Sequence, residues 1–157
     1  MSEYSHIAGQ LSADKISAMP STTIEEFKLA HGSIEAMLIA GEALTGDVPK
    51  LVEHLSRVSD DVIKHFVAKD AFYPALATQC TAAGDAAGAH LTHIFESNML
   101  VQSTAVRRFF QSVATAPSAS LVASFQTVAA VIRQRFSTEE RAIFPLYVRS
   151  SKGKGAS

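Results

Sequence analysis

The stretch HFVAKDAFYPAL, residues 65–76, returns in altered form as RFSTEERAIFPLY, residues 135–147. In both copies apolar residues recur every three or four positions, which is the spacing of one face of an α-helix. Both copies also carry a proline directly after aromatic residues, and proline bends or ends helices. The copies lie about 70 residues apart. The repeat therefore predicts two related helical hairpins that pack together with approximate two-fold symmetry.

Outward from these two stretches, the same periodicity predicts four helices separated by turn residues. Gly46 and Pro117 separate the helices within each predicted hairpin. Pro74 is expected to bend or end the second helix. The predicted helices cover residues 23–45, 49–78, 85–114 and 118–149. Four such helices joined by short turns predict an all-α fold, an antiparallel four-helix bundle.

The helix faces that would form the core are apolar except at a few adjacent levels. Those levels carry His31 in the first helix, His65 and Lys69 in the second, and Arg135 and Glu139 in the fourth. A buried polar group without a partner destabilises a fold by roughly 1–3 kcal/mol, and a buried charge by more. We therefore expect these side chains to satisfy one another, to line water or to bind a ligand together.

The third helix has a less regular pattern. Five of its residues share one side, which we expect to face the core: Ala87, His90, Ile94, Val101 and Ala105. His90 would then join the other polar residues, with His93 nearly one turn further on as the alternative. Imidazole and carboxylate groups are the ligands of iron centres built inside four-helix bundles. The pattern is thus compatible with a metal site.

Composition limits the class of protein. The chain has 157 residues, of which 47% are apolar and 18% charged, and this suits one globular domain. A net charge of −1 gives no reason to expect nucleic acid or an anionic membrane as a partner. No apolar run approaches the roughly 20 residues of a membrane span. The single cysteine, Cys80, and the absence of a secretory signal lead us to expect a cytoplasmic protein.

We expect the bundle to occupy residues 22–149, between an N-terminal extension over 1–21 and a flexible basic tail over 150–157. No glycine-rich phosphate loop, nucleophile elbow or Cys–His arrangement stands out in the sequence. The sequence therefore favours a non-catalytic protein over an enzyme.

Four short motifs give the chain a family resemblance: FKLAHGSIEAML at 27–38, HFVAKDAFYPAL at 65–76, AHLTHIF at 89–95 and RFSTEERAIFPLY at 135–147. With them, the chain resembles the hemerythrin and HHE cation-binding family over residues 24–148. The resemblance implies a bundle in which four side chains bind metal, here His31, His65, His90 and Glu139. It implies iron as the cofactor and reversible binding of a metal ion or a small diatomic ligand, in sensing rather than turnover.

Two positions depart from the family's ligand pattern. Lys69 stands where the resemblance implies a carboxylate, and Arg135 stands where it implies a histidine. Neither protonated side chain can donate a lone pair to a metal. The di-iron ligand set is therefore incomplete, although three histidines and one glutamate could still hold a single ion.

A metal-free core is the alternative. Lys69 and Arg135 could replace the cations by pairing with Glu139, Glu140 or Asp70, and such buried pairs can fix a unique packing arrangement. The protein would then be a regulatory helical bundle that acts by binding a protein partner through its surface.

A second, weaker resemblance supports this alternative. The chain is similar to the regulator of sigma D family in two short motifs, His65-Phe66 and Arg135-Phe136 followed by Glu139-Glu140. This resemblance implies an anti-sigma factor that binds the promoter-reading region of a sigma factor.

Overall fold

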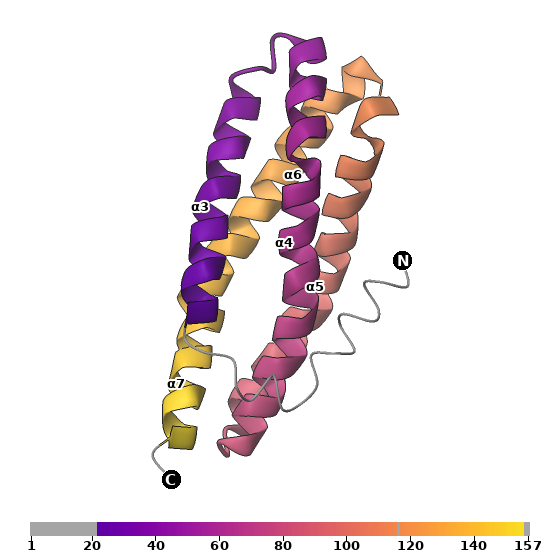
Figure 1. Cartoon of the computed structure of the whole chain (residues 1–157). Helices are drawn as coiled ribbons and strands as arrows, with labels where there is room; N and C mark the ends of the chain where they lie inside the picture. Colours follow the sequence, from indigo (N-terminus) through magenta and orange to yellow (C-terminus); the bar gives the residue numbers. More distant parts are fainter. Residues whose placement is uncertain (1–21, 116, 156–157) are drawn as a thin grey trace.

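Four helical rods pack side by side in the computed structural model, which describes residues 22–115 and 117–155 (Figure 1). The fourth rod is continuous from α6 through a π-helical turn, η2, into α7. The bounds are α3 Thr22–Glu42, α4 Val48–Ala82, α5 Ala86–Ser112, the 3₁₀ turn η1 Val113–Thr115, α6 Ser118–Thr138, η2 Glu139–Ile143 and α7 Phe144–Gly155. The predicted all-α antiparallel bundle is confirmed. The predicted extension over 1–21 lies outside the described residues.

Short polar residues and one glycine set the helix boundaries. The Asp47 side chain accepts a hydrogen bond from the backbone N–H of Lys50 at the start of α4. Asp85 does the same for Gly88 at the start of α5, at 2.8 Å. Such caps satisfy backbone donors that the first helical turn leaves free. Between these helices Gly84 has φ of +79°, a left-handed conformation that favours glycine.

The predicted core faces of the first, second and fourth helices are buried as expected. The largest fully buried apolar side chains are Tyr73, Tyr147, Phe66, Phe72, Phe125, Phe144, Leu51, Leu55, Leu76, Leu121 and Ile132. They come from α4, α6 and α7, and α3 adds Ile24, Ile34 and Leu38. These apolar faces account for the packing of the rods, because burial removes apolar surface from water.

The predicted core face of α5 is wrong. Ile94 and Val101 are 47% and 72% exposed, and His90 is exposed as well. The buried face lies on the opposite side of the helix and consists of Gly88, Ala89, Thr92, Met99, Ser103, Val106, Phe109 and Phe110. This helix carries two apolar stripes, and the one with the methionine and the phenylalanines is buried because it removes more apolar area from water.

Two helices continue further than the sequence predicted. Pro74 is exposed inside α4, which runs on to Ala82. Because Pro74 has no N–H, the carbonyl group four residues earlier lacks its helical hydrogen bond. Water can hydrate this carbonyl group on the exposed side of the helix. α7 extends to Gly155, into the region 150–157 for which the sequence predicted a flexible tail, and Ser150 is buried.

A π-helical turn interrupts the fourth rod at Glu139–Ile143. The backbone N–H of Phe144 donates to the carbonyl of Glu139, five residues earlier. Pro145 follows directly and has no N–H to donate. The π-helical turn therefore lies where proline already interrupts the regular series of backbone hydrogen bonds of the α-helix. The turn places Glu139 and Ile143 in the core, each with no exposed surface. Such turns are frequent at functional sites.

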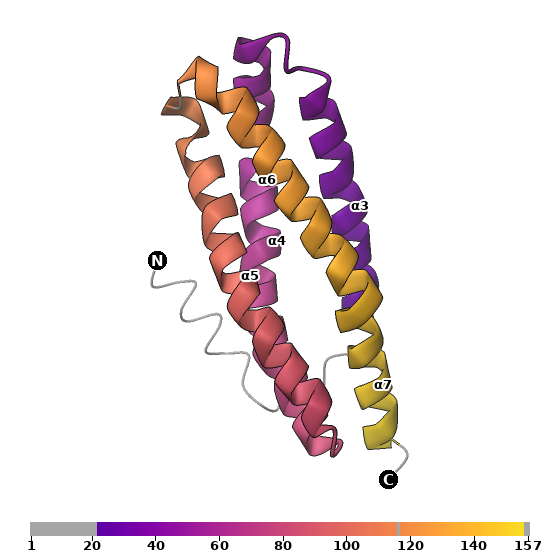
Figure 2. The ribbon, with the colours of Figure 1, turned by 180° about the vertical axis from the view of Figure 1, so that it is seen from behind.

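No helix within the described residues is long and apolar enough to cross a membrane. Figure 2 shows the bundle from behind, where α5 and α6 lie in front of α4.

Candidate functional site

A buried lysine is the centre of the polar level in the core. Lys69, on α4, has no exposed surface. Its ammonium group contacts the carboxylate of Glu139, on η2, and donates to Nε2 of His31, on α3, at 2.8 Å. Nε2 of His31 also lies 3.3 Å from Oε1 of Glu139. Three of the four rods are thus joined through one ammonium group.

Tyr73 completes the surroundings of the carboxylate. Its hydroxyl group donates to Oε2 of Glu139 at 2.7 Å, so both carboxylate oxygens have a partner. Tyr73 is not among the site residues predicted from the sequence. Its position four residues after Lys69 was the available signal, because residues four apart share one helix face.

Aromatic rings enclose the ion pair. The Phe136 ring stacks on His31 with centroids 3.7 Å apart and an interplanar angle of 6°. The Lys69 ammonium lies 4.6 Å from the centroid of the same ring and 5.7 Å from that of Phe66. An ammonium group over an aromatic face is attracted by the ring's electron density. The charge of Lys69 is therefore satisfied from several directions.

Burial and pairing set the protonation states of the ion pair. Burial lowers the pKa of Lys69 to about 8, although the charge of Glu139 opposes this shift. Burial alone would raise the pKa of Glu139, but contacts with His31 and Lys69 and the Tyr73 hydrogen bond lower it to about 2. At pH 7 the pair is therefore predominantly ammonium and carboxylate.

Lys69, Glu139, His31 and Tyr73 form a hydrogen-bonded cluster. His65 lies beside this cluster without joining its hydrogen bonds. Its ring packs edge-on against His31 with centroids 5.1 Å apart. Its Nε2 atom is buried and has no hydrogen-bond partner among the described residues, and the same is true of Nδ1 of His31. Burial lowers the pKa of His65 to about 3 and also lowers that of His31. Both imidazoles are therefore neutral at pH 7.

The two other charged residues considered for the core have different partners. Arg135 is buried, but its Nε donates to Oε1 of Gln102 on α5 at 2.7 Å. Asp70 turns outward and forms an ion pair with Arg107 of α5. Of the expected pairings, the structure contains the one between Lys69 and Glu139.

The structure brings His31, His65 and Glu139 together and leaves His90 out. His90 lies on the exposed side of α5, and His93 is 65% exposed beside Glu96. The prediction that His90 belongs to the core group is therefore wrong, and the cause is the rotated face of α5. A competing stripe through Thr92 and Met99 was the signal that could have corrected it.

The residues present do not fit a metal centre. Within residues 22–115 and 117–155, no group of three or more His, Cys, Asp or Glu side chains could hold a metal ion. His31 and Glu139, two of the expected donors, already contact the Lys69 ammonium. That group has no lone pair to offer, and its charge repels a metal cation.

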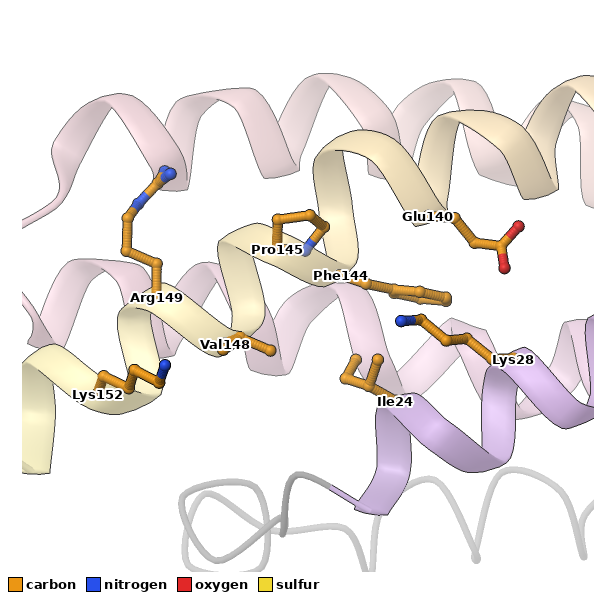
Figure 3. A pocket seen from close by; sticks show the side chains of 8 residues that line it. All are labelled: Ile24, Lys28, Glu140, Phe144, Pro145, Val148, Arg149 and Lys152. Atoms are coloured by element: carbon orange, nitrogen blue, oxygen red, sulfur yellow. The ribbon is translucent and has the colours of Figure 1, made fainter.

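Two adjoining hollows lie outside the cluster, where α3 meets η2 and α7. One, of about 410 Å³, is lined by His31, Phe136 and Glu140 among others. The other, of about 480 Å³, is drawn in Figure 3, where Lys28 extends toward Phe144. Lys28 and Glu140 line both hollows. Nδ1 of His31 lies 4.0 Å from the Glu140 carboxylate at this edge, and Lys69 and Tyr73 line a further hollow, of about 420 Å³, between α4 and α5.

Comparison with known proteins gives one match. The sequence profile of the hemerythrin HHE cation binding domain matches residues 22–147. No curated protein and no solved structure matches the chain. The matched range contains the whole cluster and all four rods as far as Tyr147.

Proposed function

Because the chain belongs to the hemerythrin HHE cation binding domain family, we propose that it is a member in which an internal ammonium group replaces the bound cation. We propose further that it is a non-catalytic regulatory bundle that acts by binding a protein. The observation that carries the proposal is the Lys69 ammonium, fully buried and shared between His31 and Glu139.

The replacement is supported by charge and by connectivity. A cation in a bundle core neutralises carboxylates and holds helices together, and the Lys69 ammonium does both for Glu139 and for α3, α4 and η2. Tyr73 satisfies the second carboxylate oxygen, so Glu139 needs no further cation. The structural role of a metal centre is thus met by the chain itself.

We therefore expect the protein to act through its surface, by binding a partner. The ion pair has no exposed surface and is flanked by aromatic rings, and the buried imidazoles are neutral at pH 7. Neither offers an activated acid, base or nucleophile to a substrate. The similarity of the motifs at 65–66 and 135–140 to the regulator of sigma D family makes the promoter-reading region of a sigma factor the first partner to test.

A cation-binding or sensing function is the second candidate. It is favoured by Nδ1 of His31 and Nε2 of His65, two buried nitrogen atoms without a hydrogen-bond partner among the described residues. If Lys69 were displaced or deprotonated, these imidazoles and Glu139 would be the residues to hold an iron ion.

Metal analysis separates the two candidates. Protein purified without chelator from iron-supplemented cells is expected to contain less than about 0.2 metal ions per chain, because the Lys69 ammonium takes the place of the cation. A metal site that stabilises the fold would instead be nearly filled under these conditions. A stoichiometry near one would overturn the proposal in favour of cation binding.

A double variant sharpens the test. Lys69→Glu with Arg135→His restores one carboxylate and one imidazole to the core, and we expect it to be less stable unless iron is added. Lys64→Glu with Arg141→His makes the same charge changes at exposed positions of α4 and η2 and should show no response to iron. Size-exclusion chromatography with a purified sigma-factor domain then tests the partner, and a failure to co-elute would rule that partner out.

A further inference from the structure

The two hairpins of the bundle have very different outer surfaces. Residues 23–70, which include α3 and most of α4, contain 13 Asp, Glu, Lys and Arg residues besides the buried Lys69. Residues 86–132, which form α5 and most of α6, include three: Glu96, Arg107 and Arg108. Figure 1 faces the charged pair of helices, and Figure 2 faces the nearly uncharged pair.

Exposed apolar side chains gather on the uncharged side. Of the six large hydrophobic side chains that are exposed in the described part of the chain, four lie on α5: Leu91, Ile94, Leu100 and Val101. Leu100 and Val101 are 63% and 72% exposed. Leu91, Ile94 and Val101 share one face of the helix, whereas Leu100 lines a hollow with Lys69 and Asp70 of α4. Clusters of exposed apolar residues on a protein surface mark interaction sites more often than single ones do.

Their spacing indicates that the partner is a helix. Five exposed residues of α5 step by three, four, three and four: Leu91, Ile94, Asn98, Val101 and Ala105. This is the alternation of the contact positions in a coiled coil, in which helices pack along a seam. The seam lies opposite the face of α5 that packs in the core. We call these five residues the α5 seam.

We propose that the α5 seam is the docking site for a second copy of this chain, which packs its own α5 seam against it in antiparallel orientation. The result is a two-fold symmetric dimer. This inference does not rest on the proposed function, because it uses neither the cluster nor the family.

The lack of charge allows a second copy to dock on the seam. In a two-fold symmetric interface a residue near the axis meets its own copy, so a charge there would lie against a charge of the same sign. None of the five seam residues is charged.

Side-chain size favours the antiparallel orientation. The larger residues, Leu91 and Ile94, occupy one end of the seam, and the smaller ones, Val101 and Ala105, occupy the other. In an antiparallel pair the large end of one copy meets the small end of the other, as close packing requires. A hollow of about 460 Å³ between α5 and α6, lined in part by Ala105, leaves room for Leu91 of the second copy.

Asn98 lies at the centre of the seam, where the two-fold axis would pass. The side-chain amide has both donors and an acceptor, so two symmetry-related copies can bond to each other. A single asparagine in a coiled-coil seam fixes register and the number of chains. The polar residue is thus placed where it would specify one arrangement.

The mass of the full chain in solution tests the proposal. Light scattering and sedimentation at roughly 10–100 µM protein are expected to give twice the chain mass of 16.8 kDa. Ile94→Glu with Val101→Glu should give a monomer with unchanged helical circular dichroism, since it places like charges across the axis. Ile39→Glu, at a 56% exposed position on α3, should remain a dimer. A monomeric unaltered chain, or a dimer that tolerates the double change, would overturn the proposal.

Cross-linking tests the orientation separately. Asn98→Cys should form a disulfide-linked dimer on mild oxidation, because the two introduced thiol groups would meet at the axis. Ile39→Cys should not, and the natural Cys80 is fully buried. Leu91→Cys should not cross-link either, because an antiparallel pair places Leu91 against Ala105 of the second copy, whereas a parallel pair would place it against its own copy. A dimer of the right mass in which Asn98→Cys fails to cross-link, or in which Leu91→Cys does cross-link, would overturn the antiparallel arrangement.

Discussion

Near the turn between α3 and α4 the core is filled by apolar groups, whereas further along the bundle it holds an ion pair. At the first level, Gly41 approaches Phe125 so closely that a Cβ atom on Gly41 would lie 2.7 Å from the ring. At the second level, Lys69 and Glu139 are in contact, and His31 and Tyr73 bond to them. The stability of the first level depends on side-chain volume, and that of the second on the pairing of charges. Substitutions that alter volume and substitutions that remove a charge should therefore affect different levels.

Removing the ammonium should have the largest effect. Lys69→Ala leaves the Glu139 carboxylate buried without its counter-charge, and we expect the free energy of unfolding to fall by about 3–5 kcal/mol. Urea unfolding followed by circular dichroism measures the loss. If the effect were below about 1 kcal/mol, as for an exposed ion pair, the second level would not depend on pairing.

A matched double variant separates pairing from volume. Lys69→Met with Glu139→Gln removes both charges and keeps similar side-chain volumes. We expect this variant to be less destabilised than Lys69→Ala, because no charge is left unpaired. Equal losses in the two variants would show that packing around Lys69, rather than its charge, is what stabilises this level.

Adding volume should have the next largest effect, and it should appear at the apolar level. Gly41→Ala places a methyl group against the Phe125 ring, and we expect a loss of about 1–3 kcal/mol from overpacking. Gly32→Ala is the control, because nothing lies within 4 Å of its added Cβ. There we expect a gain of about 0.5–1 kcal/mol from helix propensity. Thermal unfolding of both variants tests the contrast, which would fail if both changes had the same sign.

The sequence predicted the apolar level better than the polar one. Periodicity identified the buried faces of the first, second and fourth helices, which include Ile34, Leu38, Leu51 and Phe125. Periodicity suffices there because apolar packing is non-directional, so the correct face of a helix is enough. Periodicity does not suffice for α5, where two apolar faces compete and only tertiary packing decides between them.

The polar level could be predicted only in part, because hydrogen bonds need positions and directions as well as faces. The spacing brought Lys69, His31 and Glu139 to one level. It could not show that Tyr73 would donate to Glu139, that Arg135 would turn to Gln102, or that the backbone would form a π-helical turn at Glu139. The two hydrogen bonds depend on atoms from two different helices, and the turn depends on how the fourth rod packs.

Acid should weaken the polar level through His65. The pKa of this residue falls from 6.5 to about 3 on burial. Between these values the unfolded chain binds a proton that the folded chain does not. The free energy of unfolding should therefore fall as the pH falls below 6.5, by up to about 1.4 kcal/mol per pH unit for this group.

Substitution of His65 tests the assignment. His65→Phe should reduce the slope of stability against pH between pH 6.5 and 5, measured by urea unfolding at several pH values. Part of the slope should remain, because burial lowers the pKa of His31 in the same direction. His93→Gln, at a 65% exposed position of α5, is the control. An unchanged slope in His65→Phe would contradict a neutral, buried His65.

The smallest effect is expected where neither level is touched. Arg133 on α6 contacts Glu35 at 2.9 Å and Glu42 at 2.6 Å, both on α3, so it bridges the helices outside the core. These side chains are 35–40% exposed, so water and salt screen the pairs, and Arg133→Ala should cost about 0.5–1 kcal/mol. The loss should shrink in 1 M salt, where the screening length is about 3 Å, whereas the loss in Lys69→Ala should not. A salt-independent effect of Arg133→Ala would mean that its packing, rather than its charge, joins α3 to α6.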